Sequence, residues 1–323
     1  MKSGPPRTVF FICLLAGLVG FSTRTQAKMI CTFGISNINF GNIDLTANTV
    51  FDTTGTLTVN CSGGNNGDRV RICPNIETGS GGTSGGNPRF MLNGATQLLY
   101  NLYQDSAHTT VWGSFLWGNP QTAPTIDLTL GAGGSGGTSV TIFARVFASQ
   151  QTLAPGTFTS AFSGSNTRLV YATTNNTCAS LGTQNETSAP FTVSATYLPT
   201  CAISAANLNF GTAGVLASNV DGSSNLTVTC SATTGYNIGL SAGAGAGATV
   251  ASRKMTSAGA TINYSLYTTG GRTTVWGNTV GADTVSGTGS GLGQPLTVFG
   301  RVPPQTTPAP GTYTDTIVAT VTY

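Results

Sequence analysis

Apolar and polar residues alternate along many short segments of this chain, with the period of a β-strand that buries one face. Residues 57–59 and 226–228, both Leu-Thr-Val, place their apolar side chains on one face. In residues 191–197 and 313–323 the odd positions are mostly apolar, while the even ones are mostly Thr or Ser. Glycine-rich tracts such as residues 79–86 separate these segments, and no helical period of useful length is present. The pattern predicts an all-β fold.

Two long stretches of the chain carry the same motifs in the same order, which indicates an internal repeat. Each copy opens on Cys and an Asn-Phe-Gly motif, and then contains Leu-Thr-Val-x-Cys, Thr-Thr-Val-Trp-Gly, Arg-Val and Ala-Pro-Gly-Thr-aromatic. In the first copy these motifs lie at residues 31–41, 57–61, 109–113, 145–146 and 154–158, and in the second at 201–211, 226–230, 273–277, 301–302 and 309–313. The repeat predicts two β-sandwich domains joined near Leu198-Pro199-Thr200.

The N-terminus has the features of a secretory signal peptide. Lys2 and Arg7 precede an apolar run over residues 9–21, and the sequence Thr-Gln-Ala27 supplies a small-x-small cleavage pattern. A membrane anchor is the weaker alternative, because the run is shorter than the roughly 20 residues with which a helix crosses a bilayer. We therefore predict a signal peptide over residues 1–27.

Removal of the predicted signal leaves a neutral chain. The sequence has 13 Lys and Arg against 10 Asp and Glu, and three of the basic residues, with none of the acidic ones, lie in residues 1–27. With 7% charged and 39% hydrophobic residues, the chain is typical neither of charge-driven disorder nor of nucleic-acid binding.

Six cysteines remain once Cys13 leaves with the signal, and an even number in an exported chain predicts disulfides. Spacing alone does not choose among their connectivities. The repeat favours one bridge in each copy and a third between the remaining two, which pairs Cys31 with Cys61, Cys201 with Cys230, and Cys73 with Cys178. A metal site is a poor alternative, because the chain has no CxxC motif and a single histidine.

Motifs for catalysis are weak. Gly-x-Ser-x-Gly occurs at residues 82–86 and 133–137 in low-complexity loops, without the strand-to-helix context that it requires. His108 follows Asp-Ser-Ala in an expected turn, where we predict a solvated side chain. The carboxylates are scattered, and nothing positively suggests calcium or sugar binding. We therefore predict a protein that is not an enzyme and that uses no cofactor or metal.

The Cys, Asn-Phe-Gly, Thr-Val-Trp-Gly and Pro-Gly-Thr motifs together resemble the spore coat protein U domain, which is also the pilin domain of archaic, Csu-type chaperone-usher pili. The resemblance covers both copies, nearly all of residues 31–323. It implies incomplete immunoglobulin-like sandwiches, a periplasmic chaperone, an outer-membrane usher, and polymerisation by donor-strand exchange. The two-domain arrangement is similar to the tip adhesin of such pili.

The two copies end differently. After its Pro-Gly motif the second copy offers one alternating strand, over residues 312–323, whereas the first continues through two more segments to residues 191–198. We therefore expect an N-terminal adhesive domain over residues 28–198 that completes its own sandwich. The C-terminal pilin domain, residues 199–323, is expected to lack its last strand and to accept one from a neighbouring subunit.

The predicted mature N-terminus is short. Only Lys28, Met29 and Ile30 lie between the predicted cleavage site and Cys31, and three residues at roughly 3.3 Å each are too few to fill a groove in another subunit. The chain is thus expected to accept a strand but not to donate one, which suits the tip of a pilus.

Apolar residues in the loops of the first copy are candidates for surface contact. Three of them follow the shared Val-Trp-Gly motif: Phe115, Leu116 and Trp117. We expect the shared motif itself in the core, but the three residues after it in an exposed loop. An exposed apolar loop often marks a binding surface. Packing of these side chains within the enlarged domain is favoured by a small margin over surface contact. Weaker candidates are Val50, Phe51 and Leu153, for which we favour a buried loop anchor over surface contact. The resemblance implies that such hydrophobic loops lie at the distal end of the adhesive domain.

The sequence thus predicts an adhesive pilus tip subunit that attaches cells to surfaces during biofilm formation. Its expected partners are a periplasmic chaperone, an usher and an adjacent pilin, with no nucleic acid, and it is expected to pass through the periplasm to the cell surface. A structural coat or surface-assembly protein without receptor binding is the alternative. A secreted carbohydrate-active enzyme is a remote third possibility.

Overall fold

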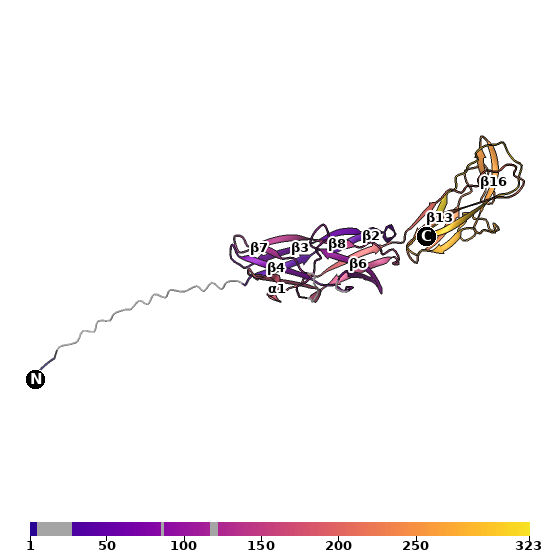
Figure 1. The fold of residues 1–323 in the computed structure, drawn as a ribbon. Helices are drawn as coiled ribbons and strands as arrows, with labels where there is room; N and C mark the ends of the chain where they lie inside the picture. The colour runs from indigo at the N-terminus through magenta and orange to yellow at the C-terminus, as the bar shows by residue number, and fades with distance from the viewer. Residues whose placement is uncertain (5–27, 85–86, 117–121) are drawn as a thin grey trace.

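The computed structural model describes residues 1–4, 28–84, 87–116 and 122–323. These residues form two β-sandwiches that follow one another along the chain, with strands over residues 30–197 and 201–322 (Figure 1). Residues 198–200, between them, belong to no strand. Residues 5–27 of the predicted signal peptide lie outside the described part. No helix within the described residues is long and apolar enough to cross a membrane.

The larger sheet of the N-terminal sandwich has eight strands in the order β1-β3-β8-β6-β5-β9-β11-β2. Neighbours are antiparallel, except that β11 runs parallel to β2. The strands are β1 (Ile30–Ile35), β2 (Ile38–Ile43), β3 (Phe51–Ser62), β5 (Arg89–Asn93), β6 (Thr96–Tyr103), β8 (Gly136–Val146), β9 (Gly156–Phe162) and β11 (Phe191–Tyr197).

The facing sheet of this sandwich has three antiparallel strands in the order β10-β4-β7. They are β4 (Arg69–Ile76), β7 (Ile126–Thr129) and β10 (Thr167–Thr173). The helical elements are short: α1 (Cys178–Leu181) and the 3-10 turns η1 (Leu45–Ala47) and η2 (Gly164–Asn166). Their shortness agrees with the absence of a helical period in the sequence.

The C-terminal sandwich repeats this plan with fewer strands. Its sheets have the orders β12-β13-β18-β16-β15 and β17-β14-β19. The strands are β12 (Cys201–Ala205), β13 (Val220–Cys230), β14 (Gly235–Leu240), β15 (Arg253–Ser257), β16 (Ala260–Tyr267), β17 (Val285–Thr288), β18 (Gln294–Val302) and β19 (Ala319–Thr322). The fold is therefore the predicted one: two immunoglobulin-like sandwiches, of which the C-terminal one lacks its last strand.

Each sandwich buries the inward residues that the alternating pattern predicts. Leu57 and Val59 are fully buried in the N-terminal core, and Leu226 and Val228 are buried in the C-terminal one. The shared Val-Trp-Gly also lies in the core, as expected. The indole N–H of Trp112 donates to the Pro74 carbonyl at 2.8 Å, and that of Trp276 donates to the Ile238 carbonyl at 2.8 Å.

The three predicted disulfides are confirmed. Cys31 bridges to Cys61 and Cys201 to Cys230, each joining the first strand of a sandwich to the strand beside it. The third bridge, Cys73 to Cys178, has no counterpart in the C-terminal domain and ties α1 to β4.

Two expectations from the sequence were wrong. Residues 312–323 do not form one strand. Thr314 makes an isolated bridge to Thr256, and a regular ladder forms only at β19, which pairs with β14. Regular pairing is absent over residues 312–317 because one side of this segment has no neighbouring strand within the described residues. His108 is not solvated, since its side chain is only 7% exposed and packs against the rings of Tyr103 and Phe143.

Candidate functional site

Strand β11 closes the N-terminal sandwich by lying between β9 and β2. It pairs with β9 from Phe191 opposite Phe162 to Tyr197 opposite Gly156, and with β2 on its other side. Every second side chain points into the core and is almost completely buried: Phe191, Val193, Ala195 and Tyr197. At roughly 1.5–3 kcal/mol for each of the three large side chains, their burial contributes on the order of 5–9 kcal/mol.

The corresponding place in the C-terminal domain is open. By the repeat, residues 208–211 correspond to the start of β2 and residues 311–317 to β9, and no described segment lies between them. Two adjoining cavities, of about 700 and 660 Å³, occupy this space. We call it the C-terminal groove, lined by Leu208, Phe210, Met255, Ile262, Tyr264, Tyr313 and Ile317 among others.

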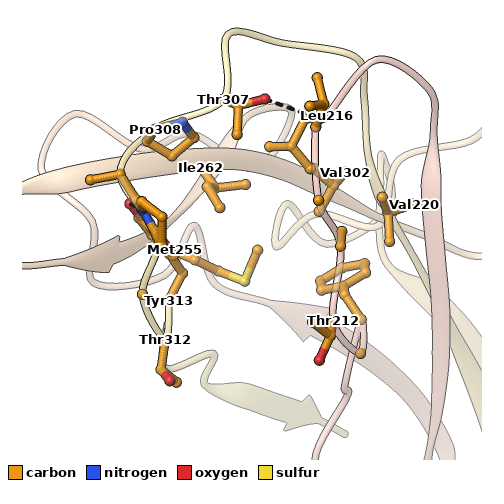
Figure 2. A pocket seen from close by; sticks show the side chains of 18 of the residues that line it. Thr212, Leu216, Val220, Met255, Ile262, Val302, Thr307, Pro308, Thr312 and Tyr313 are labelled. Carbon is orange, nitrogen blue, oxygen red and sulfur yellow. Dashed lines mark hydrogen bonds between the residues drawn. The ribbon is translucent and has the colours of Figure 1, made fainter.

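Figure 2 shows one part of the C-terminal groove from close by. Met255 and Ile262 lie between two chain segments, one that carries Thr212 and one that carries Thr312 and Tyr313. At one end a hydrogen bond joins the two sides: the N–H of Leu216 donates to the hydroxyl of Thr307 at 2.8 Å. The groove is therefore a preformed channel with an apolar floor.

Equivalent residues of the two domains differ in exposure in the way that a missing strand requires. In the N-terminal domain, four apolar residues that share the core with the inward side chains of β11 are all fully buried: Ile38, Met91, Leu98 and Phe158. Their counterparts in the repeat are only half-buried: Leu208, Met255, Ile262 and Tyr313. The C-terminal groove thus exposes a surface that the fold elsewhere covers.

The groove also contains one polar pair. The hydroxyl of Tyr264 donates to Oδ2 of Asp315 at 2.8 Å. Burial raises the pKa of Tyr264, and the hydrogen bond to the Asp315 carboxylate and the charge of that group raise it further. Tyr264 therefore stays protonated at neutral pH and donates this bond.

The candidate contact residues after Val-Trp-Gly lie on the outer face of the small N-terminal sheet. Phe115 and Leu116 are half-buried and pack against a cluster formed by Cys73, Val170, Ala172, Cys178 and Leu181. The N–H of Phe115 donates to Oδ1 of Asn75 at 2.7 Å. Trp117 lies outside the described residues. The two described side chains thus contribute part of their surface to packing and leave part of it open.

The weaker candidates lie at the other end of the domain. Val50 is 44% exposed, whereas Phe51 and Leu153 are half-buried and pack against the core. Their loops are joined by a hydrogen bond from the Ser149 N–H to Oδ1 of Asn48 at 2.8 Å. Phe51, the first residue of β3, lies opposite the last residue of β8. The last residue of β11, Tyr197, lies beside the last residue of β2, shortly before this loop. These loops therefore lie at the end of the domain where the chain continues into the second domain. This position does not match the distal one that the resemblance implies.

The sequence indicated that a strand is missing but did not identify the residues that line the groove. They could have been found by extending the repeat, because Met91, Leu98 and Phe158 have the counterparts Met255, Ile262 and Tyr313 at matching distances from the shared motifs. Among the described residues, no three His, Cys, Asp or Glu side chains lie close enough together to hold a metal ion.

Comparison with known proteins agrees with this architecture. The family model of the spore coat protein U domain matches residues 19–164 and 187–320. The chain belongs to the spore coat protein U domain family. Protein U of Myxococcus xanthus is 36% identical over 128 residues, which cover 36% of this chain and 71% of that protein.

The fold is also similar to that of one chain in a solved complex. This is the CsuC-CsuE chaperone-tip adhesion subunit pre-assembly complex from archaic chaperone-usher Csu pili of Acinetobacter baumannii. The likeness has a TM-score of 0.56 at 15% identity and covers 91% of this chain and 100% of that chain. At this identity the comparison indicates a shared fold.

Proposed function

We propose that this protein is the adhesive tip subunit of a chaperone-usher pilus, and that its C-terminal groove accepts a strand from the next subunit. The observation that carries the proposal is the contrast between β11, which fills the N-terminal domain, and the open groove at the same place in the C-terminal domain. An exposed sheet edge beside an apolar channel is the arrangement that strand addition uses.

Membership of the spore coat protein U domain family supports this proposal, as does the similarity of fold to a chaperone-bound tip subunit. An open groove of this kind invites aggregation until a strand fills it. We therefore infer that a periplasmic chaperone covers the groove after export, and that an usher at the outer membrane replaces the chaperone by the next pilin.

The division of labour between the domains follows from their closure. We propose that residues 28–198 form the adhesive domain, because β11 closes this sandwich without help from another chain. Residues 199–323 would form the pilin domain that docks onto the pilus. After cleavage at the predicted signal site, the protein would be carried to the cell surface at the pilus tip.

The groove is tested by placing a charge on its floor. In the variant Met255→Glu an unpaired carboxylate would oppose the incoming strand, so we expect the protein to lose co-purification with its pilus chaperone and to be missing from assembled pili. The matched control is Thr261→Glu, at an exposed position of the neighbouring strand β16, which should keep both properties. Normal assembly of the Met255→Glu protein would contradict the proposal.

Attachment to surfaces is tested separately. We propose that the loop with Phe115, Leu116 and Trp117 contributes the contact surface for attachment and biofilm formation. The triple change of these residues to Ser should reduce attachment at least about tenfold while piliation stays normal, whereas the control Val50→Ser should have little effect. Piliated cells that attach normally with the triple variant would remove this loop from the proposal.

A second candidate function is a structural coat or surface-assembly protein that uses the same strand acceptance but binds no receptor. The partial burial of Phe115 and Leu116 against the cluster around Cys73 favours it. It predicts that deletion of the whole chain shortens or destabilises the assembled structure, without a specific loss of attachment by the structures that still form.

A further inference from the structure

One acidic side chain points into the C-terminal groove at a position where the N-terminal domain has a small neutral residue. Asp315 lines the groove, and by the repeat it corresponds to Ser160 of β9. Ser160 is completely buried between the inward residues Phe158 and Phe162. Asp315 occupies the matching inward place between Tyr313 and Ile317, so a strand that fills the groove covers its carboxylate.

The carboxylate is held firmly in this place. Its Oδ2 accepts the Tyr264 hydroxyl, and its Oδ1 accepts the backbone N–H groups of Ala244 and Thr316, each at 2.8 Å. Gly243 packs directly against it, since a Cβ on that residue would lie 2.0 Å from Oδ2. The buried Arg253 interacts with the negative charge of Asp315.

These contacts leave part of the hydrogen-bonding capacity of the carboxylate open to the groove. An ionised carboxylate has about four acceptor sites, and three are used within the chain. Water can serve the remaining site only while the groove is open. A strand that places an apolar side chain over Asp315 removes this water without replacing its hydrogen bond, which is costly for a charged group.

Strand β11 shows which position of an incoming strand faces this carboxylate. Val193 lies directly opposite Ser160 in the antiparallel pair of β11 and β9. Side chains of directly opposed residues on one face lie about 4.5–5.5 Å apart at their Cβ atoms. In a donor that lies as β11 does, the residue in the place of Val193 therefore comes within reach of Asp315.

We propose that the strand accepted by the C-terminal groove carries a hydrogen-bond-donating side chain, a hydroxyl or an amide, opposite Asp315, where β11 has Val193. This inference rests on the proposed function of the groove. Hydrogen bonds from a neutral donor to a carboxylate are stronger than those between neutral groups, so Asp315 favours such a donor over an all-apolar one. Asp315 also fixes the register of the donor strand in the groove, because a slip of that strand by two residues places a different inward side chain over the carboxylate.

The test supplies the missing strand within the chain itself. The full chain is extended beyond Tyr323 by a Gly/Ser linker as long as residues 174–190, which join β10 to β11, followed by a copy of the β11 sequence. One version keeps Val at the position that copies Val193, and a second has the isosteric Thr there. A third version carries Gly/Ser throughout. In a fourth, the outward-facing Thr at the position of Thr192 is replaced by Val, as a control for the general effect of threonine.

We expect the Thr version to melt about 3–6 °C higher than the Val version in the C-terminal domain, as measured by calorimetry. The variant Asp315→Ser should remove or reverse this order, and Asp315→Asn serves the same purpose if the serine variant does not fold. A Val version as stable as the Thr version would overturn the role of Asp315. If the Gly/Ser version melts as high as both, the groove needs no strand and the proposed function itself is wrong.

Discussion

In both domains a buried arginine ties the same parts of the fold together. Arg89 and Arg253 occupy equivalent places in the repeat, and each donates through Nη2 to two backbone carbonyls. The acceptors are Ile76 and Trp112 at 2.9 and 2.7 Å in the N-terminal domain, and Leu240 and Trp276 at 3.0 and 2.7 Å in the C-terminal domain. Burial lowers the pKa of Arg89 to about 10, which still leaves it charged at neutral pH.

The domains diverge where the closing strand lies. Tyr100 and Tyr264 are equivalent and both buried, yet the sheet around Tyr100 continues into β11, whereas the sheet around Tyr264 ends at the C-terminal groove. Since the inner framework is shared, the groove results from the missing strand and not from a different core. The first copy thus serves as an internal model of the filled state of the second.

The largest difference is expected when the two domains are produced separately. Residues 28–198 should fold under oxidising conditions and unfold in one cooperative transition, because β11 is present. Residues 199–323 should aggregate or stay unfolded, since they lack the roughly 5–9 kcal/mol that the closing strand contributes. Circular dichroism and gel filtration of the two fragments test this. A C-terminal fragment that is monomeric and as stable as the N-terminal one would remove the distinction between them.

A smaller but sharper change opens the N-terminal domain in place. The double variant Phe191→Ser and Val193→Ser removes two inward side chains of β11 and keeps its backbone, so we expect a loss of about 5 kcal/mol or more in the unfolding free energy of this domain. The control Thr192→Ala with Ser194→Ala changes the outward face of the same strand and should cost less than about 1 kcal/mol. Equal effects of the two variants, measured by denaturant titration, would mean that β11 acts through its backbone pairing alone.

Much of the fold was predictable because the repeat and the two-residue alternation report directly on packing. The alternating residues of β11 indicated its buried face, and the cysteines shared by both copies indicated two of the bridges. The end of the chain was not predicted correctly. Residues 312–323 alternate like a strand, but alternation specifies a buried face and not a partner, so residues 312–317 lack regular pairing.

The site was less predictable than the fold. Asp315 appeared as one scattered carboxylate, because its inward position depends on its register with Ser160 in the other copy, and its partners Tyr264 and Ala244 come from distant segments. His108 was expected in solvent because it lies in a polar turn. A turn motif describes the backbone, and here the side chain folds back over the sheet onto Tyr103.

The smallest expected effect concerns this histidine and its counterpart in the other domain. Nε2 of His108 lies 3.6 Å from Asp52, which also pairs with Arg145. The equivalent residue in the C-terminal domain is Arg272, whose guanidinium lies 3.3 Å from the Asp221 carboxylate. Both residues have positive φ, 58° and 54°, so an exchange of side chains leaves the strain of the backbone nearly unchanged.

We expect His108→Arg to raise the melting temperature of the N-terminal domain by about 1–3 °C at neutral pH and low salt, because arginine is always charged beside Asp52. The hydrogen bond from Arg145 already lowers the pKa of Asp52, against the effect of burial. Relative to the uncharged variant His108→Gln, the gain should therefore be present above about pH 4 and disappear as the pH falls through the lowered pKa and Asp52 becomes protonated. Salt should weaken it. His108→Gln, which is uncharged at every pH, is the control, and a gain from glutamine equal to that from arginine would show that packing, not charge, distinguishes the two domains here.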